Sequence, residues 1–318
     1  MGTDRSSSPL VSTEWLAAHL DDPDLRIVEV RWHARFEDGR WIGVDDLDGP
    51  AAERIPGAVS VGMVSDLADS DHPVPDMLAP PEQFAKVMGR LGIGGETLVV
   101  AYDDWGLPLA SARLWWALSY YGHDRVRVLD GGLRKWRAEG RPLTSEVPTP
   151  APRTFTPRLR PDWIASKEEV AAALGRPEVA IVDCLFPHLY HSTEGHQWGE
   201  RAGHIPGAVN VPYPANADPA LAGATREERD RLLVAGRLLT YASPETLAAL
   251  YAAAGVTPDR EVITYCGRGY AASCGLLALK ILGYVNVRLY DGSWTEWSVD
   301  TGLPVEVSPA LGARSAGA

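Results

Sequence analysis

The chain contains the same series of segments twice. The clearest pair is "ERIPGAVSV", which begins at Glu53, and "GHIPGAVNV", which begins at Gly203. Four further pairs recur in the same order: "STEWLAAHL" with "RPDWIASKEEV", "LRIVEV" with "VAIVDC", "LVVAYDDWG" with "VITYCGRG", and "GHDRVRVLDGGLRKW" with "GYVNVRLYDGSWTEW". Segments that repeat in one order indicate a duplicated domain, so both halves are expected to share one architecture.

The repeats also predict the domain boundaries. A chain of 318 residues has room for two domains of about 150 residues each. We expect one domain over residues 10–140 and a second over residues 162–307. Residues 141–161 contain six prolines, which disfavour a helix and predict an extended linker. The start "MGTDRSSSP" and residues 308–318 are expected to be disordered; the start also matches a short myristoylation pattern that often occurs by chance.

Each half alternates short apolar runs with helical stretches. In the second half "VAIVDC", "AVNVP", "EVITY" and "NVRLYDG" are predicted strands, and helices are expected around residues 166–174, 244–254 and 271–282. Apolar strands that alternate with helices are typical of an α/β fold, with a mostly parallel sheet covered by helices on both faces. Ligands of such sheets bind beyond the carboxyl ends of the strands.

Composition limits the partners of the protein. Apolar residues make up 45% and charged residues 23% of the chain, as in ordinary globular proteins. A net charge of −12 argues against binding to nucleic acid or to an anionic membrane, since both need a basic surface. The sequence has neither a long apolar run nor an apolar signal core, so we expect no membrane segment. Three cysteines do not make a disulfide framework, which favours a cytoplasmic protein.

The segment "ITYCGRGYAAS" holds the strongest candidate for chemistry. A predicted strand delivers Cys266 into a glycine-containing turn that opens a helix. The free N–H groups of that helix and the neighbouring Arg268 are expected to lower the pKa of the thiol. Gly267 and Gly269 would let backbone N–H groups turn around one point, as in a cradle for an anion.

The first half has no thiol at the equivalent position. Its loop reads "AYDDWGLPLAS", with Asp103 in place of Cys266. A free cysteine is most often a small buried apolar residue, but a duplicated enzyme that keeps one site would show this asymmetry. Trp105 lies in the first loop, and together with Tyr270 it is expected to wall the site.

With the duplication, the IPGA element, the linker and one cysteine loop, the chain resembles the tandem rhodanese sulfurtransferases over residues 10–306. This resemblance implies an inactive first domain, a second domain whose cysteine becomes a persulfide, a cleft between the two, and no cofactor. It places the catalytic cysteine at Cys266. The residues expected to bind substrate are Gly267, Arg268, Gly269, Tyr270, Ala271 and Ala272.

Two departures from the family concern the substrate. The loop "CGRGYA" matches neither "CRKGVT" nor "CGSGVT", and Leu185 stands where the family usually has an arginine that holds an anionic donor. Unless Arg201 or another side chain reaches in, mercaptopyruvate and thiosulfate are expected to be poor donors. The donor would be a small molecule, such as a polysulfide, or a protein persulfide. The acceptor would be a thiol, cyanide or a sulfur carrier.

Three alternatives to catalysed sulfur transfer are also considered. A persulfide carrier or scaffold would keep the same cysteine. Cysteine-based phosphatases that share the fold need an arginine six residues after the cysteine, where this chain has Ala272. A zinc site could be built from the histidines of one segment, although their spacing matches no standard site: His188, His191, His196 and His204.

The two remaining cysteines suggest a further possibility. Cys274 would lie two turns along the helix from Cys266, and Cys184 would lie at the end of a neighbouring strand. Either could resolve a persulfide by forming a disulfide, although ordinary packing is the favoured interpretation for both.

Overall fold

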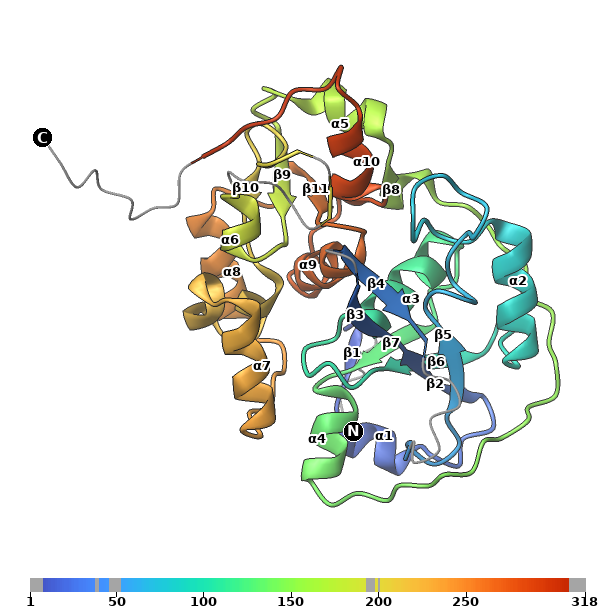
Figure 1. Cartoon of the computed structure of the whole chain (residues 1–318). Coiled ribbons are helices and arrows are strands. Elements are labelled where there is room, and N and C mark those ends of the chain that lie inside the picture. Colours follow the sequence, from blue (N-terminus) through green and yellow to red (C-terminus); the bar gives the residue numbers. More distant parts are fainter. Residues whose placement is uncertain (1–7, 38–39, 46–52, 193–197, 200, 309–318) are drawn as a thin grey trace, which may run out of the picture.

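The protein forms two α/β domains side by side, each built on one twisted sheet (Figure 1). This computed structural model describes residues 8–37, 40–45, 53–192, 198–199 and 201–308. Most of the two terminal segments for which disorder is expected, and His196 of the possible zinc site, lie outside these described residues.

The first domain has a five-stranded parallel sheet in the order β1-β7-β6-β2-β5. Its strands are β1 (Leu10–Val11), β2 (Leu25–Arg31), β5 (Val59–Gly62), β6 (Leu98–Tyr102) and β7 (Val126–Leu129). Its helices are α1 (Thr13–Ala18), α2 (Pro81–Arg90), α3 (Ala110–Tyr120) and α4 (Gly132–Ala138). A hairpin of β3 (His33–Glu37) and β4 (Arg40–Val44) stands apart from the sheet.

The second domain repeats this arrangement. Its parallel sheet has the order β10-β9-β11-β12-β8, the first order read from the other end. The strands are β8 (Ile164–Ala165), β9 (Val179–Asp183), β10 (Val209–Asn210), β11 (Glu261–Tyr265) and β12 (Val287–Tyr290). The helices are α5 (Lys167–Ala173), α6 (Pro187–Tyr190), α7 (Arg226–Val234), α8 (Pro244–Ala253), α9 (Tyr270–Ile281) and α10 (Ser293–Val299). The predicted α/β fold, the parallel sheets and the duplication are confirmed.

The repeated IPGA element has the same structural role in both halves. The N–H of Ile55 donates to the hydroxyl of Tyr102 at 3.2 Å, and the N–H of Ile205 donates to the hydroxyl of Tyr265 at 3.1 Å. These tyrosines end the central strands β6 and β11. Since a buried N–H needs a partner, the motif ties the loop before β5 or β10 to the end of the central strand.

The domains meet along their equivalent helices α3 and α9, which pack against each other. Both helices are buried over almost their whole length, as expected for helices that are apolar all round. One core cluster therefore runs through both domains, and a smaller cluster covers the outer face of each sheet. Within the described part of the chain, no helix is both long and apolar enough to cross a bilayer.

The proline-rich segment between the domains is extended and lies along the first domain. The N–H of Arg153 donates to Gly89 at 3.0 Å, and that of Arg158 donates to Tyr121 at 2.8 Å. Phe155 is buried against Phe84. Its backbone hydrogen bonds and its buried phenylalanine therefore hold this segment in place.

The β3–β4 hairpin and α7 were not anticipated from the sequence. Among the residues that the structure describes, neither has a counterpart in the other half, so the repeat could not point to them. The hairpin sequence is rich in charged residues and lacks the apolar run of a core strand. For α7 a local signal existed, because Thr225 and Glu228 form a capping box at its start.

Candidate functional site

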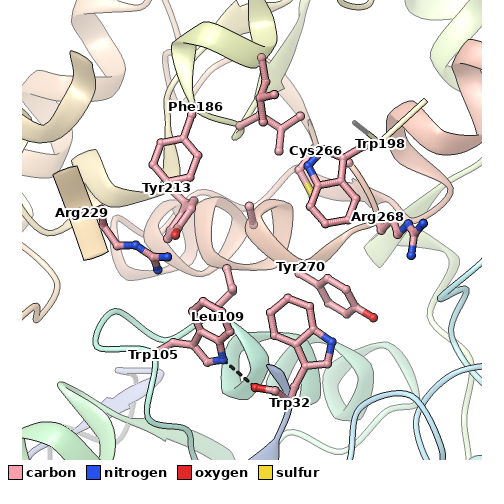
Figure 2. A pocket seen from close by; sticks show the side chains of 14 residues that line it. Trp32, Trp105, Leu109, Phe186, Trp198, Tyr213, Arg229, Cys266, Arg268 and Tyr270 are labelled. Carbon is pink, nitrogen blue, oxygen red and sulfur yellow. Dashed lines mark hydrogen bonds between the residues drawn. The ribbon is translucent and has the colours of Figure 1, made fainter. Parts of the chain in front are cut away.

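A pocket with about 590 Å³ of empty space lies where the two domains meet (Figure 2). The first domain contributes Trp32, Trp105 and Leu109 to its lining. The second domain contributes Leu185, Phe186, Leu189, Trp198, Tyr213, Arg229, Cys266, Gly267, Arg268, Tyr270 and Ala271. The walls are therefore mostly aromatic and aliphatic, and the polar groups in them are few.

Cys266 follows directly after β11, and neighbouring elements hold its backbone on both sides. Its N–H donates to the hydroxyl of Ser293 at 3.2 Å, and its carbonyl accepts from the N–H of Trp294 at 2.9 Å. Both partners belong to the start of α10. The residue is only 2% exposed, and it lines the pocket at the carboxyl end of the sheet.

Backbone N–H groups of the following turn lie within interaction range of the sulfur. They belong to Arg268, Ala271 and Ala272, and each stabilises the thiolate relative to the thiol. Two glycines make this turn possible. A Cβ at Gly267 would lie 2.5 Å from the ring of Trp198, and Gly269 has a φ of +80° as it starts α9.

The expected lowering of the thiol pKa is wrong for the resting protein. Burial raises the pKa of Cys266 above its ordinary value, and the N–H groups of Ala272, Arg268 and Ala271 offset only part of this effect. The negative charge of Asp183 also raises it. The physical reason is that desolvation disfavours a buried thiolate more strongly than the three N–H groups favour it.

The raised pKa predicts how alkylation depends on pH. Only the thiolate reacts. As long as the pH lies below the pKa, each increase of one pH unit raises the thiolate fraction about tenfold. We expect the rate of Cys266 alkylation by iodoacetamide, followed by peptide mass spectrometry, to keep rising beyond pH ~8.5, the ordinary thiol pKa. A plateau at or below neutral pH would contradict the raised pKa and restore the original expectation.

The equivalent cradle in the first domain holds a carboxylate. Asp103 accepts hydrogen bonds from the N–H groups of Leu109 at 3.0 Å and Ser111 at 2.8 Å, and from the Ser111 hydroxyl at 2.8 Å. Asp103 is 2% exposed and does not line the pocket. Its cradle is thus occupied by a side chain of the chain itself, whereas the cradle of the second domain receives the sulfur of Cys266.

Arg268 does not act on the sulfur as expected. Its Nη1 pairs with Asp76 of the first domain at 3.0 Å, and its guanidinium lies 5.3 Å from the ring of Trp198. It lines the pocket, but its charge is not among the leading causes of the shifted Cys266 pKa. Because Asp76 matches its charge, Arg268 serves the contact between the domains, and its backbone N–H is what faces the sulfur.

Leu185 lines the pocket, and Arg201 does not take its place. The guanidinium of Arg201 donates to the carbonyl oxygens of Trp297, Ser298, Asp300 and Leu303 at 2.7–3.0 Å. Besides Arg268, the pocket lining contains a second arginine, Arg229 of α7. The sequence comparison missed it because α7 has no counterpart in the first half.

The other predicted positions are distributed as follows. Tyr270, Ala271 and Trp105 lie in the pocket lining, as expected for the two aromatic rings, while Gly269 and Ala272 are not part of it. Cys184 and Cys274 are buried outside the lining. Burial raises the pKa of Cys184 well above its ordinary value and that of Cys274 to about 12, so both are poor candidates for resolving a persulfide.

The histidines of the possible zinc site have other contacts. His204 Nδ1 lies 2.9 Å from the carbonyl of Tyr190, and His191 Nδ1 lies 2.9 Å from the carbonyl of Ser308. Among the described residues, no three histidine, cysteine or acidic side chains come together as a metal site would require.

Several aromatic residues of the pocket were not predicted. Trp32 contacts both Trp105 and Tyr270, with ring centroids 5.1 and 4.8 Å apart, and so joins the two domains. It follows the end of β2 as Phe186 follows the end of β9. The rule that ligands bind beyond the carboxyl ends of parallel strands could have found both of them. No such signal marked Trp198 or Tyr213.

Comparisons with known proteins agree with this architecture. The family described as Rhodanese-like domain matches residues 12–139 and again residues 166–300. The sulfur carrier protein TtuD of Thermus thermophilus is 36% identical over 307 residues, which cover 93% of this chain and 95% of that protein. The thiosulfate sulfurtransferase of Azotobacter vinelandii is 34% identical over 305 residues, which cover 96% and 99%.

A solved structure extends this likeness to three dimensions. The crystal structure of SseA from Escherichia coli, from a study of 3-mercaptopyruvate sulfotransferases, superposes with a TM-score of 0.75 at 29% sequence identity. The match covers 91% of this chain and 99% of SseA.

Proposed function

Because the chain belongs to the rhodanese-like domain family, we propose that it is a sulfurtransferase that carries the transferred sulfur as a persulfide on Cys266. The observation that carries this proposal is the contrast between the two equivalent cradles. In one, the N–H groups hold the carboxylate of Asp103; in the other, N–H groups of the turn favour negative charge on the sulfur of Cys266, which lines the pocket. The same backbone geometry therefore accepts an anion, and only one copy offers a nucleophile.

The proposed reaction has two halves. In the first, the Cys266 thiolate attacks the outer sulfur of a donor; an S–S bond forms, and the donor leaves with the electron pair of the broken bond. In the second, a nucleophilic acceptor takes the terminal sulfur and releases the Cys266 thiolate. The N–H groups of Arg268, Ala271 and Ala272 would stabilise the persulfide anion between the halves. We assign catalysis to residues 162–307 and a non-catalytic role to residues 10–140.

A sulfurtransferase requires a donor and an acceptor of sulfur, and the site suggests which ones. Leu185 supports our proposal that mercaptopyruvate and thiosulfate are poor donors, and that a polysulfide or a protein persulfide supplies the sulfur. A thiol, cyanide or a sulfur carrier would accept it. All three cysteines are free and buried, which supports a reducing compartment such as the cytoplasm.

A persulfide carrier is the second candidate function. It is favoured by one observation, the 36% identity to a protein named as a sulfur carrier. Sulfur uptake by the purified protein tests the common persulfide step, and uptake should depend on Cys266. The number of sulfur atoms that each chain passes on then separates an enzyme from a carrier.

A substitution at Leu185 tests the missing anion contact. Leu185→Arg should raise kcat/KM for mercaptopyruvate and thiosulfate by about tenfold to a hundredfold, because a charge-assisted hydrogen bond contributes about 1.5–3 kcal/mol. Steady-state kinetics with both donors provide the measurement. Leu185→Met is the matched control, since it changes shape without adding charge. Parent kinetics already equal to those of ordinary family members would show that the missing arginine does not limit these donors.

A further inference from the structure

Arg229 is a buried cation with free hydrogen-bond donors. Its side chain is 2% exposed, and it reaches the pocket from α7. Its Nη2 pairs with the half-exposed Asp230 at 2.5 Å. Among the described residues, its Nε and Nη1 have no hydrogen-bond partner. A buried polar group without a partner costs about 1–3 kcal/mol, and more when it is charged, so these donors are suited to a ligand.

Aromatic rings from both domains hold the guanidinium of Arg229. It lies 5.2 Å from the ring centroid of Trp105 and 5.8 Å from that of Tyr213. Figure 2 shows Arg229 on the side of the pocket opposite Cys266 and Arg268, with its guanidinium turned toward Tyr213 and Trp105. The rings fix the position of the cation, but they give its N–H groups no oxygen acceptor.

The two arginines of the pocket differ in their electrostatic surroundings. Arg268 pairs with Asp76, whose side chain is 8% exposed, and among the described residues its buried Nε has no hydrogen-bond partner. Asp230, the partner of Arg229, is 47% exposed. Solvent therefore screens the charge of Asp230 more strongly than that of Asp76. An anion that enters the pocket therefore gains a more favourable electrostatic energy from Arg229 than from Arg268.

The rest of the lining determines what kind of anion fits. Between Arg229 and Cys266 the walls are rings and aliphatic side chains, among them Trp32, Trp105 and Phe186. A mostly apolar lining with a few polar groups is typical of pockets that bind organic ligands. An inorganic anion of a few atoms would leave these apolar walls in contact with water.

We propose that this pocket binds an organic acid with an apolar, aromatic body, whose carboxylate pairs with Arg229 while its other end faces Cys266. The inference rests on the proposed function, because such an acid would be one of the two reactants of sulfur transfer. The body would lie against the rings of Trp32 and Trp105. The anion contact would thus lie on α7, which has no counterpart among the described residues of the first domain, instead of at the position of Leu185.

Phenylbutyrate, which carries no sulfur, tests recognition alone. Isothermal titration should show that the parent protein binds it, and the bound acid should slow alkylation of Cys266. Neutral phenylbutyramide should bind about tenfold to a hundredfold more weakly, because it lacks the charge-assisted contact. Butyrate, which lacks the ring, should also bind weakly. Equal binding of the acid and its amide would overturn the inference, and this comparison needs no variant.

A variant pair then tests the residue. Arg229→Gln should weaken phenylbutyrate binding by about tenfold to a hundredfold and leave phenylbutyramide binding unchanged. Arg231→Gln removes the same charge from the same helix, at a side chain outside the pocket lining, and should bind the acid like the parent. If both variants lost the same affinity for phenylbutyrate, α7 would supply only a general positive charge. That result would contradict the inference.

The inference and the proposed function can fail separately. A parent protein that takes up sulfur from polysulfide but binds no phenylbutyrate would overturn the inference alone. One that binds phenylbutyrate through Arg229 but takes up no sulfur from any donor would overturn the proposed function.

Discussion

The Cys266→Ser variant should gain no sulfur atom when treated with a donor, whereas the parent protein should gain one that cyanide or a reducing thiol removes. Sulfur transfer should fall by at least about a thousandfold, since the loss of a catalytic nucleophile removes the covalent route altogether. Serine keeps nearly the size of the side chain but cannot form a persulfide. Intact-mass measurement of the two proteins, with and without donor, is the test.

Cys274→Ser is the matched control for this result. Cys274 is buried outside the pocket lining, where its sulfur accepts a hydrogen bond from Tyr241 at 3.1 Å. Serine can keep that contact, so sulfur uptake should remain as in the parent. An added sulfur that persists in Cys266→Ser would remove the persulfide from Cys266, and loss of uptake in Cys274→Ser would bring a second cysteine into the reaction.

Arg113→Met should lower the free energy of unfolding by about 3–5 kcal/mol, the usual cost of leaving a buried charge without its partner. Arg113 of α3 and Asp291, which follows β12, form an ion pair across the two domains, and their side chains are 1% and 2% exposed. Arg113 also donates to the carbonyl of Asp76 at 2.8 Å. Methionine fills similar space but leaves the carboxylate of Asp291 unpaired.

A second substitution separates lost charge pairing from lost packing. In the Arg113→Met background, Asp291→Asn removes the unpaired charge, and its side-chain oxygen can still accept the N–H of Leu78, a 2.8 Å hydrogen bond in the parent. The double variant should therefore recover much of the lost stability. Chemical denaturation followed by two probes is the measurement, because two domains can unfold in separate steps. A loss below about 1 kcal/mol in the single variant, as at exposed pairs, would contradict this role.

The Arg113–Asp291 ion pair also explains how the first domain, which has no cysteine, contributes to the site. A Cβ at Gly269 would collide with both the Arg113 guanidinium and the Asp291 carboxylate, so the turn after Cys266 is packed against the pair. The guanidinium lies 5.4 Å from the ring centroid of Tyr270. The first domain thereby supports the backbone that holds the sulfur, in addition to one wall of the pocket.

Local patterns and the internal repeat were sufficient to predict the architecture of the protein. Apolar runs that alternate with helical stretches predicted parallel sheets, and the repeat predicted two of them. The repeat also aligned Asp103 with Cys266, and the structure places both at the ends of equivalent central strands. These features depend on short segments whose backbone preferences act locally, so they can be read from the sequence.

Only the tertiary structure decided the electrostatics of the site, because burial and charge pairing join residues that lie far apart in the chain. The pKa of Cys266 rises because desolvation outweighs three N–H groups, a balance that no local pattern records. Arg268 lies next to the cysteine in sequence but pairs with Asp76 of the other domain. Arg229, from a helix without a repeat, reaches the pocket instead. The sequence by itself therefore determined which cysteine we propose as the nucleophile, and long-range packing determined which charges lie around it.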